Sequence, residues 1–473
     1  MASLKLERRA SAMAACELLR IIFPGRIAFP ADANYGSEME LSWSSNCWLP
    51  AACFVRPADA NGVAQVLRVV KKTGARFAVR GGGQNFNPGF SSVGGYGIVL
   101  DLQDLNSLYL ENDKTLQVGA GNTWGHVFRF LDQSGLSAAG GRQNNVGVSG
   151  FLLGGGMPAF PNLHGLGADN VRNFEVVLSN ATIVNANAYE NADLYLALKG
   201  GGSNFGVVTR FDIATYPIMT ETTIATFRLE GYREVLWTVV QAQEAMEKDP
   251  KIGMFLTVNP GFIAVGLLYA DAILERPHVF ESFFKLKSLI QVVVPTTTGT
   301  MKSLVNAIGP LTPPTRRLIS TVTTKVSYDF YLAVHQFWLD TANHQPGIDS
   351  LSYNIQPASP ATAQLGKDKG ENVLGLEKVT QTWWSFVAEW SDSVNDERAS
   401  QGLDVLQQGI ARLAEEQGQS LDFLSMNAAK YSQDVLGSYG QENVARLSNT
   451  AAKYDPEGFF QTHQNDGFLL RKI

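Results

Sequence analysis

The feature that most constrains this chain is a set of four glycine-rich segments within its first 210 residues. They are residues 80–84 (RGGGQ), 140–150 (GGRQNNVGVSG), 154–156 (GGG) and 200–206 (GGGSNFG). Glycine permits positive φ angles and lets the backbone approach a ligand closely. Successive backbone N–H groups that point into one concavity bind anions such as a diphosphate. One such segment is commonly only a tight turn, but four together favour a large, flat ligand that carries phosphates.

A dinucleotide-binding motif of the Rossmann type is the main alternative for these glycines. The run GAGNTWG at residues 119–125 lies between a strand-like and a helix-like segment. It has one residue too many before its last glycine, and the acidic residue that should bind a ribose hydroxyl about twenty residues later is missing. No GxxxxGK[ST] phosphate loop occurs in the sequence either. The ligand is therefore expected to be held in another way.

Apolar spacing in the first half predicts alternating strands and helices. Apolar residues between positions 63 and 70 recur at helical spacing, so a helix should run from Asp59 or Asn61 to Gly74. A second amphipathic helix should begin near Trp124 and end at Gly135. Strands are predicted at residues 76–80, 98–102, 108–111 and 115–118, the last two forming a hairpin.

The pattern changes near residue 218, where the glycine triplets cease. Strands predicted at 254–258, 263–269 and 320–327 mix with helices such as 403–418. The fold class is therefore α+β with two domains. We expect a first domain at residues 1–217, a second at 218–425, and a C-terminal segment at 426–473 that returns to the first.

Composition excludes several classes of partner. The 473 residues carry a formal net charge of −6 and a pI near 5.6, which leaves no basic surplus for a nucleic acid or an anionic membrane. No apolar run approaches the roughly twenty residues that span a bilayer. The charged N-terminal segment lacks the apolar core of a signal peptide. Instead, the spacing of Met13, Leu18, Ile21 and Ile22 predicts an amphipathic helix on the first domain, and a cytosolic location is expected.

Three cysteines and six histidines show no metal-binding spacing, so no metal site is predicted. Buried thiols are the simpler interpretation of Cys16, Cys47 and Cys53. A Cys16–Cys53 disulfide stays open, since a reducing cytosol argues against it.

Several runs closely resemble the FAD-linked oxidases of the berberine-bridge-enzyme type, which share the vanillyl-alcohol-oxidase (PCMH-type) flavoprotein fold. They are ARFAVRGGGQNFNPGFSS, VGAGNTW, GGRQNNVGVSGFLLGGG, GADNVRNFEVVLSNATIVNAN, DLYLALKGGGSNFGVVTRF, NVLGL and KYDPEGFF. The likeness covers nearly the whole chain and is closest to fungal secondary-metabolite enzymes. It implies FAD lying between an FAD-binding domain made from both chain ends and a substrate domain whose antiparallel sheet, with covering helices, lies over the isoalloxazine ring.

The resemblance also assigns FAD contacts position by position. The diphosphate loop corresponds to Arg80, Gly81, Gly82, Gly83, Gln84 and Asn85, and a second stretch to Gly147, Val148, Ser149, Gly150, Gly154, Gly155 and Gly156. The segment along the adenosine and flavin corresponds to Asn204, Phe205, Gly206, Val207 and Val208, and the flavin edge meets Asn427.

Two departures from the family concern the attachment of FAD. Many relatives have a histidine at the position of Gln84 that bonds to the flavin 8α-methyl carbon, and some have a cysteine at the position of Gln143. An amide nitrogen cannot replace either, because its lone pair is delocalised into the carbonyl. We therefore predict non-covalent FAD, and a weaker oxidant suited to activated alcohols, amines or phenols. The alternative is that Gln84 donates a hydrogen bond in a non-covalent homologue with unchanged chemistry.

A third departure concerns the catalytic base. Many relatives have an Asn-Tyr pair near the C-terminus, whereas here Asn427 is followed by Ala428, whose methyl group cannot take a proton. His164, Tyr431 and Tyr439 are the candidates to replace it, although such residues are commonly structural.

The leading hypothesis is an FAD-dependent oxidase or dehydrogenase that acts on a small, largely apolar natural-product intermediate. Hydride would pass to flavin N5 and then to molecular oxygen. Aromatic residues that would suit an apolar pocket or an ordinary core equally are Trp383, Trp384, Phe386 and Trp390. The alternatives are an FAD-bound non-redox cyclase, a flavin-binding protein without catalysis and, with less support, a carbohydrate oxidase.

Overall fold

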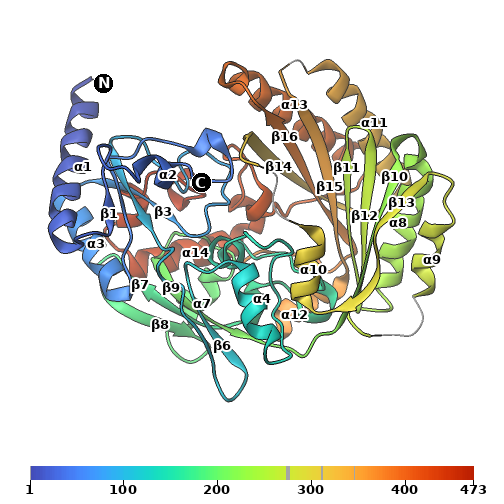
Figure 1. Ribbon diagram of the computed structural model, residues 1–473, viewed down its shortest axis with the longest axis horizontal. Helices are drawn as coiled ribbons and strands as arrows, with labels where there is room; N and C mark the ends of the chain where they lie inside the picture. The colour runs from blue at the N-terminus through green and yellow to red at the C-terminus, as the bar shows by residue number, and fades with distance from the viewer. Residues whose placement is uncertain (1, 273–276, 310–312, 346) are drawn as a thin grey trace.

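Three β-sheets organise the chain in the computed structural model, which describes residues 2–272, 277–309, 313–345 and 347–473. Two of the sheets lie in one half of the molecule and the third, larger sheet in the other half (Figure 1). None of the described helices is long and apolar enough to cross a membrane.

The first sheet has four strands in the order β1 (Ile27–Ala28), β2 (Cys53–Val55), β4 (Gly97–Asp101) and β3 (Arg76–Arg80). Helix α3 (Ala60–Thr73) connects β2 to the parallel pair β3 and β4. It begins after Asp59, whose carboxylate accepts a hydrogen bond from the Gly62 N–H, and ends at Gly74 with φ of 67°. The predicted helix and both predicted strands are confirmed.

The second sheet is antiparallel, in the order β5 (Leu108–Leu110), β6 (Thr115–Gly119), β9 (Val207–Ala214), β7 (Val171–Val177) and β8 (Ile183–Asn187). It confirms the predicted hairpin. The short helices between its strands are α4 (Trp124–Asp132), α5 (Val148–Leu153), α6 (Pro161–His164) and α7 (Ala192–Leu198).

The third sheet has eight strands, all paired antiparallel. Their order is β13 (Leu289–Gly299), β10 (Thr220–Arg228), β12 (Phe262–Tyr269), β11 (Ile252–Asn259), β15 (Ser350–Ala358), β16 (Gln381–Trp390), β14 (Arg316–Lys325) and β17 (Ser420–Leu421). The helices that pack with it around one core include α8 (Tyr232–Met246), α11 (Tyr328–His344) and α13 (Asp396–Glu416). The arrangement confirms the predicted α+β fold with an antiparallel sheet and covering helices.

The chain end returns to the first sheet, as Figure 1 also shows. The Phe77 N–H in β3 donates to the His463 carbonyl, and the Asn465 N–H donates to the Phe77 carbonyl. The remaining helices are α2 (Tyr35–Met39), α9 (His278–Phe284), α10 (Met301–Ile308), α12 (Pro360–Asp368), α14 (Gln441–Tyr454) and α15 (Phe459–Thr462). Because α10 contributes Met301 and Leu304 to the core of the first half, the boundaries at 217 and 425 stay a prediction.

The N-terminal helix α1 (Ala2–Ile22) forms, but the face predicted to be buried is wrong. Met13 and Ile21 are 48% and 79% exposed. The buried face consists of Ala12, Ala15, Cys16 and Leu19. Three of these four side chains are small, which lets the helix pack closely against α3 and β4.

A disulfide joins Cys16 of α1 to Cys53 of β2, with Cα atoms 6.0 Å apart, and this answers the question that the sequence left open. Cys47 is a buried free thiol. Stable disulfides are typical of oxidising compartments, so the bond weakens the argument for a cytosolic location, which stays a prediction.

Candidate cofactor and active site

The glycine-rich segments meet around a cavity of about 410 Å3. They reach it from the end of β3, from the start of α5 and from the start of β9, and the C-terminal segment closes it. The predicted cofactor residues that line the cavity are Gly81, Gly82, Gly83, Gln84, Asn85, Gly147, Ser149, Gly150, Gly154, Gly206, Val207, Val208 and Asn427.

Two of these segments touch backbone to backbone. A Cβ atom added to Gly82 would lie 2.4 Å from the Gly147 Cα, closer than any real contact of this kind. The Asn427 amide joins the C-terminal segment to the same wall: its Nδ2 donates to the Gly150 carbonyl at 2.8 Å, and its Oδ1 accepts from the Gly156 N–H at 3.1 Å. Because these glycines have no side chains, the two loops can pack directly against each other with their backbone N–H groups exposed.

Three buried polar atoms of the lining have no partner within the described residues: Trp43 Nε1, Ser91 Oγ and Gln464 Oε1. Buried polar groups in folded proteins are almost always hydrogen-bonded, so these atoms indicate a polar ligand. Together with the glycine loops they fit FAD, which offers hydroxyls, phosphates and ring nitrogens. Sequence reasoning missed all three, since they lie in segments without a repeated pattern.

Arg80 does not face the cavity, which corrects the prediction that it contacts the diphosphate. Its Nε donates to Asp101 at 2.7 Å and its Nη2 to Glu38 at 3.1 Å, and the side chain is almost fully buried. The guanidinium is thus paired with the carboxylates of Asp101 and Glu38. Its role is to fix the end of β3, from which the glycine loop starts.

Five other predicted cofactor residues also lie outside the lining: Val148, Gly155, Gly156, Asn204 and Phe205. Asn204 illustrates how they act. Its Nδ2 donates to the Phe468 carbonyl at 2.9 Å and its Oδ1 accepts from the Leu470 N–H at 3.0 Å. Asn204 therefore positions Phe468, which does line the cavity.

His164 lies away from the cavity, in a polar cluster beside α12. Its ring stacks on Tyr216 with centroids 4.0 Å apart, and its Nε2 is buried without a partner within the described residues. Burial, aided by the nearby Lys369 ammonium, lowers the pKa of His164 to about 4.

Neither tyrosine candidate lines the cavity. The Tyr439 hydroxyl donates to the Gly200 carbonyl at 3.2 Å, and burial raises its pKa, which makes it a poor base. Tyr431 is 41% exposed, and its hydroxyl lies 3.2 Å from Ser400 Oγ. The catalytic roles of Tyr431, Tyr439 and His164 therefore stay predictions without support from the geometry.

The aromatic residues of β16 belong to the hydrophobic cores. Trp384, Phe386 and Trp390 pack in the core of the third sheet, and Trp383 packs against Phe423. None of the four lines the cavity.

Comparison with known proteins agrees with this geometry. Residues 51–187 match the family model described as an FAD binding domain. The FAD-dependent monooxygenase yanF of Aspergillus niger is 34% identical over 456 residues, which cover 94% of this chain and 77% of the relative. This chain belongs to the same family of FAD-dependent enzymes as that relative. It is thus an FAD-linked oxidoreductase, as the motifs predict.

Two solved structures share the fold. BBE-like 1 of Physcomitrella patens superposes with a TM-score of 0.79 at 17% identity, over 96% of this chain and 99% of that one. Glucooligosaccharide oxidase of Acremonium strictum gives a TM-score of 0.77 at 20% identity, over 96% and 98%. That oxidase carries a 6-S-cysteinyl, 8α-N1-histidyl FAD. In this chain, Gln84 and Gln143 line the cavity.

Proposed function

We propose that this flavoprotein oxidises a small, largely apolar natural-product intermediate and holds FAD without a covalent link. The observation that carries the proposal is the glycine-lined cavity with Gln84 and Gln143 in its wall. Neither glutamine has the imidazole or thiol that a covalent bond to flavin requires. When bound, FAD supplies a two-electron acceptor that takes hydride at N5.

The chain's own residues would bind and orient the cofactor. Backbone N–H groups of the loops at Gly82 and Gly147 would bind the diphosphate. Ser91 and Gln464 offer unpaired polar atoms to hydroxyls or ring nitrogens. The lining from the second half of the chain includes Ile319 and Met426, whose apolar side chains favour an apolar substrate and exclude water.

No free general base lines the cavity within the described part of the chain. Asp466 is its only ionisable side chain, and its carboxylate accepts from the Lys472 ammonium at 2.6 Å. We infer that the substrate loses its proton to solvent or is already ionised, which suits acidic substrates such as phenols and enols.

The test is anaerobic mixing of the holoprotein with a panel of phenols, allylic alcohols and amines. We expect one class to bleach the visible flavin absorbance and to yield a product that has lost two hydrogen atoms. A product of unchanged mass, formed while the flavin absorbance stays that of the oxidised form, would contradict the proposal and support the cyclase alternative.

A monooxygenase reaction is the second candidate, because the Aspergillus niger relative bears that name. It would use the same cavity. Turnover under isotopically labelled oxygen separates the two, since only a monooxygenase transfers labelled oxygen into the product.

A further inference from the structure

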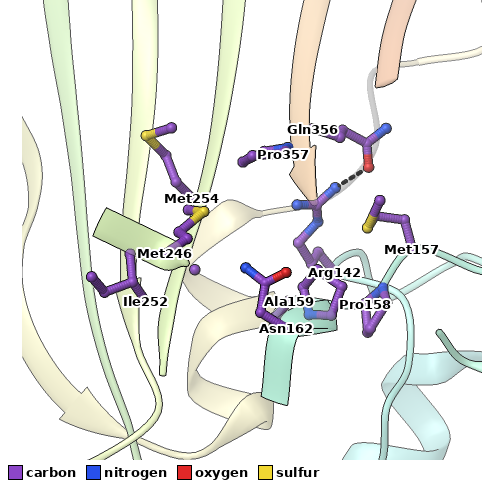
Figure 2. Close-up of a pocket in the computed structure, with 12 residues that line it drawn as sticks. Arg142, Met157, Pro158, Ala159, Asn162, Met246, Ile252, Met254, Gln356 and Pro357 are labelled. Carbon is purple, nitrogen blue, oxygen red and sulfur yellow. Dashed lines mark hydrogen bonds between the residues drawn. The ribbon is translucent and has the colours of Figure 1, made fainter. Parts of the chain in front are cut away.

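Arg142 and Arg317 each place a guanidinium over an aromatic ring, but the two rings differ in what lies beside them. The Arg142 Cζ lies 5.3 Å from the centroid of the Phe255 ring, and its Nη2 donates to Gln356 Oε1 (Figure 2). The hollow beside Arg142 has a volume of about 0 Å3, so no ligand fits there. Arg317 instead covers the ring of Trp43, which lines the cavity of about 410 Å3 that we assign to FAD.

The Arg317 guanidinium is fixed in place over Trp43. Its Cζ lies 3.9 Å from the centroid of the indole ring, and the residue is 0% exposed. Its Nη1 donates to the Trp43 carbonyl at 2.7 Å, and its Nε donates to Glu389 Oε1 at 2.9 Å. Arg317 lies on β14 and Glu389 on β16, so both belong to the third sheet. Because Glu389 balances its charge, Arg317 needs no anionic ligand, and it acts on the cavity through its contact with the indole.

The main chain at Trp43 is bound to both halves of the molecule. The Trp43 N–H donates to the carbonyl of Gly83 in the glycine loop at 2.9 Å. The Arg317 N–H in the third sheet donates to the Ser44 hydroxyl at 3.0 Å. Since Arg317 covers one face of the indole, the other face or the edge of the ring is the part that lines the cavity. A side chain fixed in this way loses little conformational entropy when a ligand packs against it.

We propose that the Trp43 ring packs against the isoalloxazine ring of bound FAD, and that Arg317 is a positioning residue that acts through Trp43. The proposal rests on the proposed function, because it requires FAD in this cavity. Flat aromatic rings that pack in offset or edge-to-face geometry contribute more than their buried area alone. Indole is rich in electrons and the oxidised isoalloxazine ring is poor in them, so the pair should add a charge-transfer absorbance beyond the main visible band of the flavin.

The adenine ring of FAD is the competing partner for Trp43. The isoalloxazine ring is favoured, because the substrate has to meet it at the end of the cavity that the third sheet lines. Ile319 marks this end: it lines the cavity and lies two positions after Arg317 in β14, so both side chains point to the same face of the sheet. Trp43, which contacts Arg317, therefore lies at the isoalloxazine end.

The test titrates the apoprotein with FAD, with FMN, which lacks adenine, and with ADP, which lacks isoalloxazine. Flavin fluorescence measures the first two affinities, and the shift of the thermal midpoint follows ADP binding. We expect Trp43→Leu to weaken FAD and FMN binding by roughly three- to tenfold, the range for ring stacking, and to leave ADP binding unchanged. The variant should also lose the charge-transfer absorbance. Trp43→Phe should keep most of the affinity but lose that absorbance, since a phenyl ring is a poorer electron donor than indole.

Arg317→Met tests the positioning role, because methionine fills the space without holding Trp43. We expect a loss of FAD affinity comparable to that of Trp43→Leu, and no further loss when the two changes are combined. Arg317→Lys keeps the charge beside Glu389 without the planar contact, so it should lose affinity only in part. The matched control is Arg316→Met: Arg316 is the preceding residue of β14 and its guanidinium pairs with Asp396, so FAD affinity should stay as in the wild type.

Unchanged FMN affinity and unchanged long-wavelength absorbance in Trp43→Leu would overturn the proposal, whether or not the Arg317 variants fold. Loss of ADP binding with FMN binding intact would assign Trp43 to the adenine ring and overturn it as well. Additive effects of Trp43→Leu and Arg317→Met would overturn the positioning role of Arg317. A wild-type apoprotein that binds none of the three ligands would contradict the proposed function, and this proposal with it, so the two failures are distinguishable.

Discussion

At the residue scale, Gly82 shows why the glycines of this site cannot be exchanged. The nearest atoms to an added Cβ belong to the Gly147 backbone, which has no side chain that could move aside. We expect Gly82→Ala to separate the two loops and to weaken FAD binding by roughly tenfold or more, with a loss of about 1–3 kcal/mol of stability. Fluorescence titration of the apoprotein with FAD measures the affinity. The control is Gly36→Ala, where nothing lies within 4 Å, and equal effects of the two variants would contradict the argument.

Gln84 is central to the proposal that FAD is bound without a covalent link. We expect acid precipitation of the holoprotein to release all flavin into the supernatant, because neither Gln84 nor Gln143 can form a bond to it. Gln84→His supplies an imidazole in the cavity wall, so part of its flavin should stay with the precipitate. Coloured wild-type precipitate would refute non-covalent binding, and Gln84→Asn serves as the matched control without an imidazole.

Much of the lining could be predicted at this scale, because a run of glycines between regular elements serves either a tight turn or the close approach of a ligand. Arg80 could not, since its sequence position does not reveal the carboxylates of Glu38 and Asp101 that surround it. Trp43 and Gln464 were missed for the same reason. Each reaches the cavity from a segment that only the tertiary fold brings near the glycine loops.

At the scale of elements, apolar spacing predicted α3, β3, β4 and the β5–β6 hairpin because these are short elements with local stop signals. Strand β14 was predicted at 320–327 but spans Arg316–Lys325. It starts earlier because Arg316 pairs with Trp390 of β16, and it ends earlier because Ser327 caps α11, its hydroxyl accepting from the Phe330 N–H. The buried face of α1 consists mainly of small residues. A prediction based on the spacing of large apolar residues does not identify such a face.

The disulfide between Cys16 and Cys53 gives α1 a testable role. It closes a loop across 37 positions, so its loss should lower the free energy of unfolding by about 3–4 kcal/mol in the loop-entropy model. Guanidinium unfolding of Cys16→Ser with and without reductant measures this. The wild type should lose stability on reduction, whereas the variant should not respond. If reduction left the wild type unchanged, the bond would not contribute.

At the scale of the whole molecule, each half holds a histidine whose pKa is lowered chiefly by burial: the half-buried His164 beside the core of the first half, and the buried His335 in the core of the third sheet. His335 is 1% exposed, stacks on Tyr232 and shares a hydrogen bond with the Tyr353 hydroxyl at 2.9 Å. Burial, aided by Arg233, lowers its pKa to about 4. In both halves, therefore, a histidine with a lowered pKa should make the folded state less stable at acid pH.

The direction of the pH dependence of stability follows from the number of protons that the folded and the unfolded states bind. An unfolded histidine takes up a proton below about pH 6.5, whereas His335 in the folded chain stays neutral down to about pH 4. Between these values the unfolded state binds more protons, so stability falls as the pH falls, by up to about 3 kcal/mol for His335. We expect His335→Gln to flatten the fall in unfolding free energy between pH 6.5 and 4, since glutamine keeps a polar group for Tyr353 and does not titrate. The control variant His278→Gln replaces an exposed histidine, so its unfolding free energy should fall between pH 6.5 and 4 as it does in the wild type. If the fall were equally steep in His335→Gln and His278→Gln, His335 would not be the group that takes up the proton.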